Sequence, residues 1–171
     1  FALRLDNAGQ LRDMCLITIP LDSRIGLKTE QAHEDAPHSA FFKPWMRARP
    51  GEIMRAIDAA QSGDWLTLAQ QAELDSIYLH GVTMTGGNKQ KIFAWEPETI
   101  PLFRLCDDLR AEGVPVYFST DTGPTVVLMV HKDNAAVVAG RVRALGFDCV
   151  PGDIAPGAHV VDMPDALAEL A

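Results

Sequence analysis

The sequence predicts an α+β fold, a ferredoxin-like sandwich in which a mostly antiparallel sheet carries helices packed on one face, with a helical insertion in addition. Three observations predict it. From about Thr99 onward, helical and extended patterns follow one another in the order helix, strand, strand, helix, strand. The connections between these segments are short, so consecutive strands can pair antiparallel. One further strand near the N-terminus is separated from them by three helical segments, which form the insertion.

The N-terminal part supplies the first strand and the start of the insertion. Asp13–Pro20 is a short, mostly apolar segment, which is typical of a strand. Thr29 can cap a helix that Pro37 then interrupts. Pro50-Gly51 is expected to end the next segment, so that Glu52–Ser62 forms a separate short amphipathic helix. A cluster of large apolar side chains is expected to anchor this region to the core: Phe41, Phe42, Trp45 and Met46.

The last helix of the insertion is expected over Trp65–Gly81. Gly63 stops the helix before it, and Asp64 can serve as its N-cap. Val82–Lys91 is polar and contains a Gly-Gly pair, so we expect a flexible loop there. Neither the GxxxxGK[ST] pattern of a phosphate-binding loop nor GxGxxG occurs in the chain.

The second half of the chain supplies most of the sheet. Thr125–Val130 is apolar without alternation, which indicates a central strand covered on both faces. Gly113 and Gly146 are expected to end the two helices of this half. The expected elements are a helix over Ile100–Glu112, strands over Val114–Ser119 and Thr125–Val130, a helix over Ala135–Leu145, strands over Phe147–Val150 and Ala158–Val161, and a marginal helix over Pro164–Ala171.

Composition excludes several classes of protein. A chain of 171 residues is long enough for one ordinary domain, and its net charge of −8 argues against a nucleic-acid binder with a broad basic surface. No apolar run approaches the length of a membrane span or a signal peptide. Cys15, Cys106 and Cys149 lack the short spacing of a zinc site or disulfide framework. A cytoplasmic protein, working in a reducing compartment, is the natural expectation.

The turn Thr120-Asp121-Thr122-Gly123-Pro124 joins the two strands of the second half and is the strongest candidate for a functional site. It holds a carboxylate, two hydroxyls, a glycine that permits unusual φ angles, and a proline. A carboxylate carried between two core strands has a rigid support, which favours chemistry. The local sequence favours the alternative, in which Asp121 accepts hydrogen bonds from its own backbone in an Asx-turn.

Two further groups of residues are candidates. Lys28 and Thr29 lie where a strand leads into a helix N-terminus, which predicts an anion site, although a solvated basic loop is the simpler interpretation. His80 lies beside the apolar stripe of its helix and needs a polar partner, so it either lines a cavity or is a satisfied core histidine. His33 and His38 do not reproduce HExxH, and no metal site is expected.

Several blocks of the sequence resemble one protein family. Val116–Val126 resembles the D-A-G-P-N strand-turn motif of the C-terminal domain of mevalonate diphosphate decarboxylases and phosphomevalonate decarboxylases. Leu79–Thr83 is similar to the M-H-A-x-x helix end of that family, Ser39–Trp45 to its S-x-F-[YF]-x-x-W segment, and Gly157–Val160 to its closing strand. The resemblance spans Asp13–Val161 and places the chain in the superfamily of galactokinase, homoserine kinase and mevalonate kinase.

The resemblance implies an ATP-dependent decarboxylation of a phosphorylated mevalonate in isoprenoid biosynthesis. The C3 hydroxyl is phosphorylated, and phosphate then leaves as carbon dioxide is lost. Asp121 matches the catalytic aspartate of the family. The residues that the resemblance assigns to substrate binding are Lys28, Thr29, Thr122, Gly123 and His80.

The resemblance also implies partners. ATP and Mg²⁺ are expected to bind mainly to an N-terminal domain with a glycine-rich loop, which is absent from residues 1–171. The chain begins at Phe1 without a methionine, so we expect it to be the C-terminal, substrate-side piece of a longer two-domain polypeptide, inactive when isolated. Its expected partners are a small-molecule substrate, its own N-terminal domain and a second copy in a homodimer.

Departures from the family pattern bear on the substrate. Where the family has V-S-S-R, this chain has Gly26-Leu27-Lys28-Thr29, and Thr122 and Thr125 replace the Ala and Asn of the turn motif. A changed phosphate-binding segment favours mevalonate 5-phosphate over the 5-diphosphate. Two alternatives stay open: a mevalonate 3-kinase that does not decarboxylate, and a non-catalytic regulatory domain that binds a small ligand.

Overall fold

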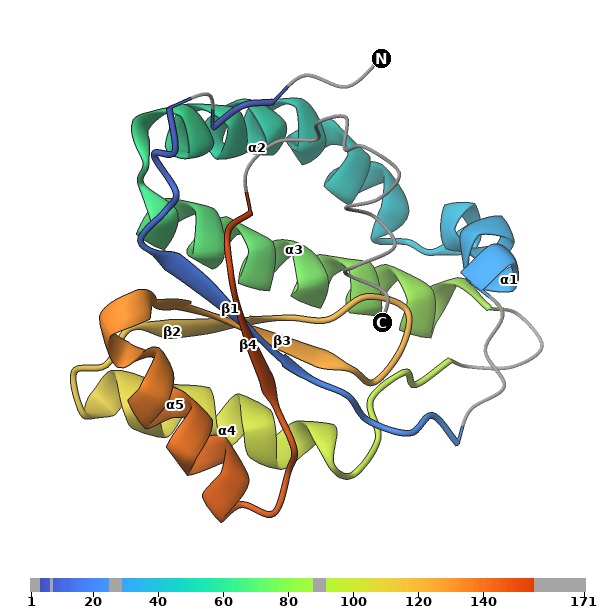
Figure 1. Cartoon of the computed structure of the whole chain (residues 1–171). Coiled ribbons are helices and arrows are strands. Elements are labelled where there is room, and N and C mark those ends of the chain that lie inside the picture. Colours follow the sequence, from blue (N-terminus) through green and yellow to red (C-terminus); the bar gives the residue numbers. More distant parts are fainter. Residues whose placement is uncertain (1–3, 7, 25–28, 88–91, 156–171) are drawn as a thin grey trace, which may run out of the picture.

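A four-stranded antiparallel sheet forms the centre of the molecule, with strand order β2-β3-β1-β4 (Figure 1). The structure, a computed structural model, describes residues 4–6, 8–24, 29–87 and 92–155. The strands are β1 (Met14–Ile19), β2 (Val116–Ser119), β3 (Val126–His131) and β4 (Val150–Asp153). The helices are α1 (Thr29–Asp35), a 3₁₀ turn η1 (Ala36–His38), α2 (Phe42–Ser62), α3 (Trp65–Gly86), α4 (Thr99–Ala111) and α5 (Lys132–Ala144).

The connectivity confirms the predicted α+β, ferredoxin-like class. Leu128 of β3 lies opposite Phe118 of β2 and Ile17 of β1, and every neighbouring pair of strands is antiparallel. In chain order the elements are β1, the insertion α1–α3, α4, β2, β3, α5 and β4. Without the insertion, this is a split βαβ arrangement in which β3 separates β1 from β2.

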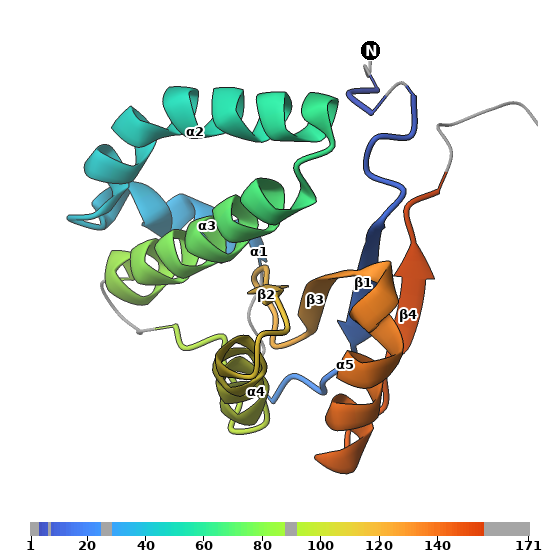
Figure 2. The ribbon, with the colours of Figure 1, turned by 90° about the vertical axis from the view of Figure 1, so that its left-hand side faces the viewer.

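Helices cover both faces of the sheet (Figure 2). On one face, α4 and α5 bury their apolar sides against the strands, and Leu102, Leu109 and Val138 belong to the same core cluster as Leu128 and Val130. On the other face, Met129 packs with Met14 of β1 and Ala69 of α3. The helical insertion therefore supplies the cover of the second face. This arrangement explains why β3 is apolar at successive positions, as expected for a central strand.

The three cysteines are buried and free. Burial raises the pKa of the Cys106 thiol to about 12. They pack as small apolar side chains, as the sequence predicted. No helix among the described residues is both long and apolar enough to cross a membrane.

The helix α2 differs from the prediction because it runs through Pro50 without ending. A proline inside a helix removes one backbone hydrogen bond and bends the helix, but contacts on both sides can hold it. Trp45 donates to Asp75 of α3 through its indole Nε1 at 3.1 Å, and Arg49 donates to the same carboxylate. On the other side of Pro50, Ala59 and Ala60 are buried. The prediction of a separate helix over Glu52–Ser62 was therefore wrong.

The predicted aromatic anchor holds for Phe42 and Trp45, which are half-buried and pack together, but it was wrong for Phe41 and Met46. Phe41 is 58% exposed and Met46 is 48% exposed. The helix α2 packs on α3 instead of on the sheet, so its large side chains meet another helix and the solvent. Phe41, Trp45 and Tyr78 line an apolar hollow of about 450 Å³ between the two helices.

Three elements have boundaries that differ from the sequence prediction by three residues or more. The helix α3 continues to Gly86, into the segment predicted as a loop, because Gly86 lies against α1: a Cβ there would be 2.6 Å from the carbonyl oxygen of Asp35. The helix α5 starts at Lys132, where His131 Nδ1 accepts from the backbone N–H of Asp133. The strand β4 lies later than predicted because Pro151 and Gly152 pair with β1. The predicted elements over Ala158–Val161 and Pro164–Ala171 lie outside the described residues.

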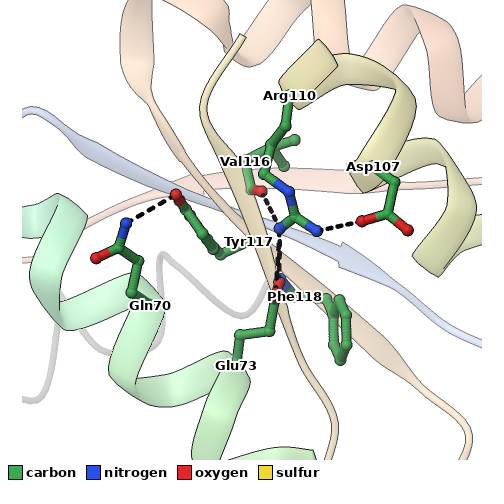
Figure 3. A network of polar contacts seen from close by, with 7 residues as sticks. All are labelled: Gln70, Glu73, Asp107, Arg110, Val116, Tyr117 and Phe118. Carbon is green, nitrogen blue, oxygen red and sulfur yellow. Dashed lines mark hydrogen bonds and ion pairs between the residues drawn. The ribbon is translucent and has the colours of Figure 1, made fainter. Parts of the chain in front are cut away.

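The strand β2 is an edge strand, and side chains of α3 and α4 satisfy its free edge (Figure 3). Glu73 accepts from the backbone N–H of Phe118 at 2.9 Å, and Arg110 donates to the carbonyl of Val116 at 3.0 Å. Arg110 also pairs with Glu73 at 3.0 Å and with Asp107 at 2.6 Å. Burial lowers the pKa of Arg110, but these carboxylates outweigh it and hold the pKa above its usual value.

Replacing Glu73 by alanine should destabilise the protein markedly. The change leaves the Phe118 N–H without its acceptor and Arg110 without its main partner, so we expect the free energy of unfolding to fall by about 2–3 kcal/mol. Urea denaturation measures this difference. The matched control is Glu112→Ala, which removes an exposed pair with Arg141 and should leave the free energy of unfolding nearly unchanged, because water screens exposed ion pairs. Equal losses in the two variants would contradict this account of the edge.

Candidate active site

The Asp121 turn lies at the end of the sheet where β2 gives way to β3. Asp121 is exposed, whereas Thr120 before it and Pro124 after it are buried. Among the described residues, none forms a hydrogen bond with the Asp121 carboxylate. The Asx-turn interpretation therefore has no support in the structure, and the carboxylate is open to a ligand.

Gly123 is not needed for the backbone geometry of the turn, contrary to the expectation from the sequence. Its φ angle is not in the left-handed region, which among the described glycines is adopted by Gly9, Gly63, Gly113 and Gly146. An added Cβ at Gly123 would meet nothing within 4 Å. Gly123 therefore leaves open space two residues from the Asp121 carboxylate.

The helix α3 holds Thr120, the residue that precedes Asp121. The backbone N–H of Thr120 donates to Ser76 Oγ at 3.1 Å, and Thr120 Oγ1 lies 2.7 Å from His80 Nε2. Ser76 Oγ is also 3.2 Å from Ser119 Oγ. Residues 76 and 80 are one helical turn apart and therefore share a face of α3. The end of β2 is thus hydrogen-bonded to two consecutive turns of α3.

The imidazole of His80 lies behind the turn, inside the protein. His80 is 2% exposed, and its ring centroid is 5.2 Å from that of Trp95. Burial lowers the pKa of His80, and the charge of Asp121 opposes this shift only partly. His80 is therefore neutral at neutral pH and satisfied by Thr120. The sequence left open whether His80 lines a cavity or is a satisfied core histidine, and the structure shows the second.

Thr122 and Thr29 meet on the other side of Asp121. Their Oγ1 atoms are 2.9 Å apart, although 93 positions separate them in the chain. The structure therefore brings together Thr29, Asp121, Thr122 and Gly123, four of the six residues singled out from the sequence. His80 lies behind them, and Lys28 lies outside the described residues.

Glutamates at the start of α4 hold the segment that leads from β1 toward α1. Glu96 is buried and accepts from the backbone N–H of Arg24 at 2.7 Å. Glu98 pairs with the Arg24 side chain. Sequence reasoning included Thr120 in the turn but gave no role to its contact with α3, and it did not identify Glu96 as part of the site. An alternation argument at the end of β2 predicts that Thr120 points inward if Asp121 points outward, but no sequence signal identifies Glu96.

These residues define the chemistry that the site can perform. An exposed carboxylate on an anchored turn, flanked by two hydroxyls, can orient an alcohol and accept its proton. The described residues contain no group of three or more potential metal-ligating side chains. This end of the sheet is therefore suited to proton transfer and to hydrogen bonding of a polar ligand.

Comparison with known proteins identifies a relative with a stated activity. The phosphomevalonate decarboxylase of Haloferax volcanii is 36% identical over 141 residues, which are 82% of this chain and 43% of that protein. The chain thus spans less than half the length of this relative. No protein-family model matches the sequence.

Solved structures share the fold. Mevalonate diphosphate decarboxylase from Staphylococcus aureus aligns with a TM-score of 0.83 at 21% identity, over 94% of this chain and 49% of that one. Mevalonate-3-kinase from Thermoplasma acidophilum, with mevalonate 3-phosphate and ADP bound, aligns with a TM-score of 0.75 at 13% identity, over 86% of this chain and 45% of that one. The chain therefore belongs to the phosphomevalonate decarboxylase family, and it shares the fold of about half of a mevalonate diphosphate decarboxylase structure.

Proposed function

We propose that this chain is the substrate-side domain of an enzyme that decarboxylates mevalonate 5-phosphate at the expense of ATP. The observation that carries the proposal is the Asp121 turn: an exposed carboxylate whose two neighbours, Thr120 and Thr122, are both hydrogen-bonded to other elements. The 36% identity with a phosphomevalonate decarboxylase supports the reaction class and the 5-phosphate. The 5-diphosphate is the second choice of substrate.

Asp121 acts on the C3 hydroxyl of the substrate in this proposal. A tertiary alcohol is a poor nucleophile unless a base orients it and takes its proton. Asp121 is exposed and has no competing hydrogen bond within the described part of the chain. Its carboxylate is therefore free to accept the proton when the hydroxyl attacks the transferred phosphoryl group. Loss of phosphate together with carbon dioxide then gives an isopentenyl product.

The hydroxyls beside Asp121 bind the polar parts of the substrate. Thr29 and Thr122 are within hydrogen-bonding distance of each other; one hydroxyl donates to the other, and the accepting hydroxyl keeps its own proton to donate to a carboxylate or phosphate oxygen. Gly123 leaves the space into which the substrate fits. Lys28, next to Thr29 in the sequence, supplies a positive charge for the phosphate.

ATP and Mg²⁺ are assigned to the remainder of the polypeptide. The described residues contain no group of three or more His, Cys, Asp or Glu side chains that could hold a metal ion, and Mg²⁺ is usually held by one or two carboxylates together with phosphate oxygens and water. When bound, ATP supplies the phosphoryl group. The role of this chain is to hold the substrate and to move the proton.

One assay distinguishes the proposed decarboxylase from a kinase. The complete polypeptide is incubated with ATP and either mevalonate, its 5-phosphate or its 5-diphosphate, and both ADP and carbon dioxide are measured. We expect equal amounts of ADP and carbon dioxide, with the highest kcat/KM for the 5-phosphate. ADP without carbon dioxide would instead identify a 3-kinase, an activity named for a protein of the same fold.

Asp121→Asn in the complete polypeptide should lower kcat by about 10²- to 10⁴-fold, the usual contribution of a positioned base. The fold should be unaffected, because the side chain is exposed. Circular dichroism and the unfolding midpoint check the fold. Asp58→Asn, an exposed aspartate on α2, is the matched control and should retain full activity. Near-normal turnover of the Asp121 variant would favour the non-catalytic ligand-binding alternative.

Gly123→Ala separates substrate binding from folding. The backbone conformation and the open space tolerate a methyl group, so the free energy of unfolding should be unchanged or higher by up to about 1 kcal/mol. KM should nevertheless rise roughly tenfold, which corresponds to about 1.4 kcal/mol of lost binding. Gly140→Ala on α5, where a Cβ also meets nothing within 4 Å, should leave KM unchanged. An unaltered KM in the Gly123 variant would remove Gly123 from the site.

Residues 1–171 alone should show no turnover, because the groups that bind ATP are assigned to the remainder of the polypeptide. Purified chain at high concentration, incubated with ATP, Mg²⁺ and mevalonate 5-phosphate, should release no carbon dioxide above background. Measurable turnover by the isolated chain would contradict the two-domain proposal.

A further inference from the structure

The hydrogen-bonded ladder between β2 and β3 stops short of the Asp121 turn. The last paired residues are Ser119 and Val127. From residue 120 to residue 125, no strand pairing holds the backbone. The direction of the Asp121 side chain must therefore be set by other contacts.

The helix α3 supplies those contacts at Thr120. Two polar groups of this residue, the backbone N–H and the hydroxyl, are bonded to α3, at 3.1 Å to Ser76 Oγ and at 2.7 Å to His80 Nε2. Thr120 is 4% exposed, Ser76 is 5% exposed and His80 is 2% exposed, so water does not compete for these bonds. Two bonds to neighbouring turns of one helix restrict both translation and rotation of the residue that precedes Asp121.

Aromatic rings hold His80 in place from behind. The His80 ring lies 5.2 Å from Trp95, Trp95 lies 5.4 Å from Phe103, and Phe103 stacks at 4.0 Å on Phe118 of β2 itself. The series of rings therefore begins at Phe118 within β2 and ends at His80, which contacts Thr120 just after β2. A histidine packed in this way has little freedom to change rotamer. It is a rigid support for the Thr120 hydroxyl.

We propose that His80 and Ser76 are positioning residues: through Thr120, they direct the Asp121 carboxylate toward the reacting hydroxyl of the substrate. This inference rests on the proposed function, and it reassigns His80 from substrate binding to support of the turn. The reason is geometric. Thr120 is buried and Asp121 is exposed, so the bonds that hold Thr120 against α3 fix the backbone from which the Asp121 side chain extends outward. A displacement of about 1 Å at a reacting group can cost about 10²-fold in rate.

The test uses the complete polypeptide with Thr120→Val, His80→Leu and the double variant. Thr120→Val keeps the shape of the side chain and removes only the hydroxyl. We expect kcat to fall roughly 30- to 100-fold in each single variant, with KM within about twofold, because Thr29 and Thr122 are untouched. The double variant should be no worse than either single variant, since both remove one bond. Thr120→Ser should restore most of the lost kcat.

A control removes another α3–β2 side-chain bond that does not involve Thr120. Gln70 Nε2 donates to the hydroxyl of Tyr117 at 2.9 Å (Figure 3), and Gln70→Met should leave kcat unchanged. A purely structural role of the α3–β2 contact predicts a different pattern. The fall in kcat would then follow the fall in the unfolding midpoint, and Gln70→Met would lose activity as well. A rise in KM by the same factor as the fall in kcat would also overturn the positioning role.

A second measurement does not depend on turnover. Backbone ¹⁵N order parameters for residues 121–123 should be near the rigid value of about 0.85 in the unaltered protein and should fall below about 0.6 in Thr120→Val. Unchanged order parameters in Thr120→Val would overturn the proposal, whether or not the protein turns over any mevalonate phosphate. The two proposals can fail separately. If residues 121–123 are rigid in the unaltered protein and lose that rigidity in Thr120→Val, but the unaltered protein releases no carbon dioxide, the proposed function fails while the anchoring of Asp121 stands.

Discussion

The free edge of β2 is the constraint on which the rest of the structure depends. An edge strand presents unpaired N–H and C=O groups, which must be bonded or left to water. Here Glu73 and Ser76 accept from the N–H groups of Phe118 and Thr120. Alternate residues of a strand direct their N–H groups to the same side, and residues three apart on a helix share a face. A single helix laid along the strand can therefore satisfy both donors.

This interaction decides where the helical insertion lies. The helix α3 covers the second face of the sheet and at the same time replaces a fifth strand at the edge. Its contact side is consequently mixed, with Ala69 against Met129 and polar side chains against β2. The helix α2 then packs on α3 through Trp45, Arg49 and Asp75. In the part of the chain that the structure describes, several of its large apolar side chains are exposed: Met46, Ile53 and Met54.

The same interaction leads from the fold to the site. The row of polar residues on α3 ends at His80, where the strand becomes the Asp121 turn. The start of α1 reaches the other side of that turn through Thr29, and Gly86 allows α1 and α3 to approach closely. The insertion therefore contributes support on both sides of Asp121. Asp121 is held in place through its neighbours Thr120 and Thr122, and none of the described residues forms a hydrogen bond with its carboxylate.

The sequence by itself determined the class of the fold, most of the helices and strands, and the position of the turn that carries Asp121. Apolar periodicity, helix-ending glycines and a run like Val126–Val130 are local signals that burial imposes on any chain. Only the tertiary structure decided that α2 passes through Pro50, that α3 continues to Gly86, and that Thr29, Ser76 and His80 gather around residues 120–122. These outcomes depend on contacts between residues 26 or more positions apart, such as Arg49 with Asp75 and His80 with Thr120. The energy of such contacts comes from groups that are adjacent only after folding, so no local pattern records it.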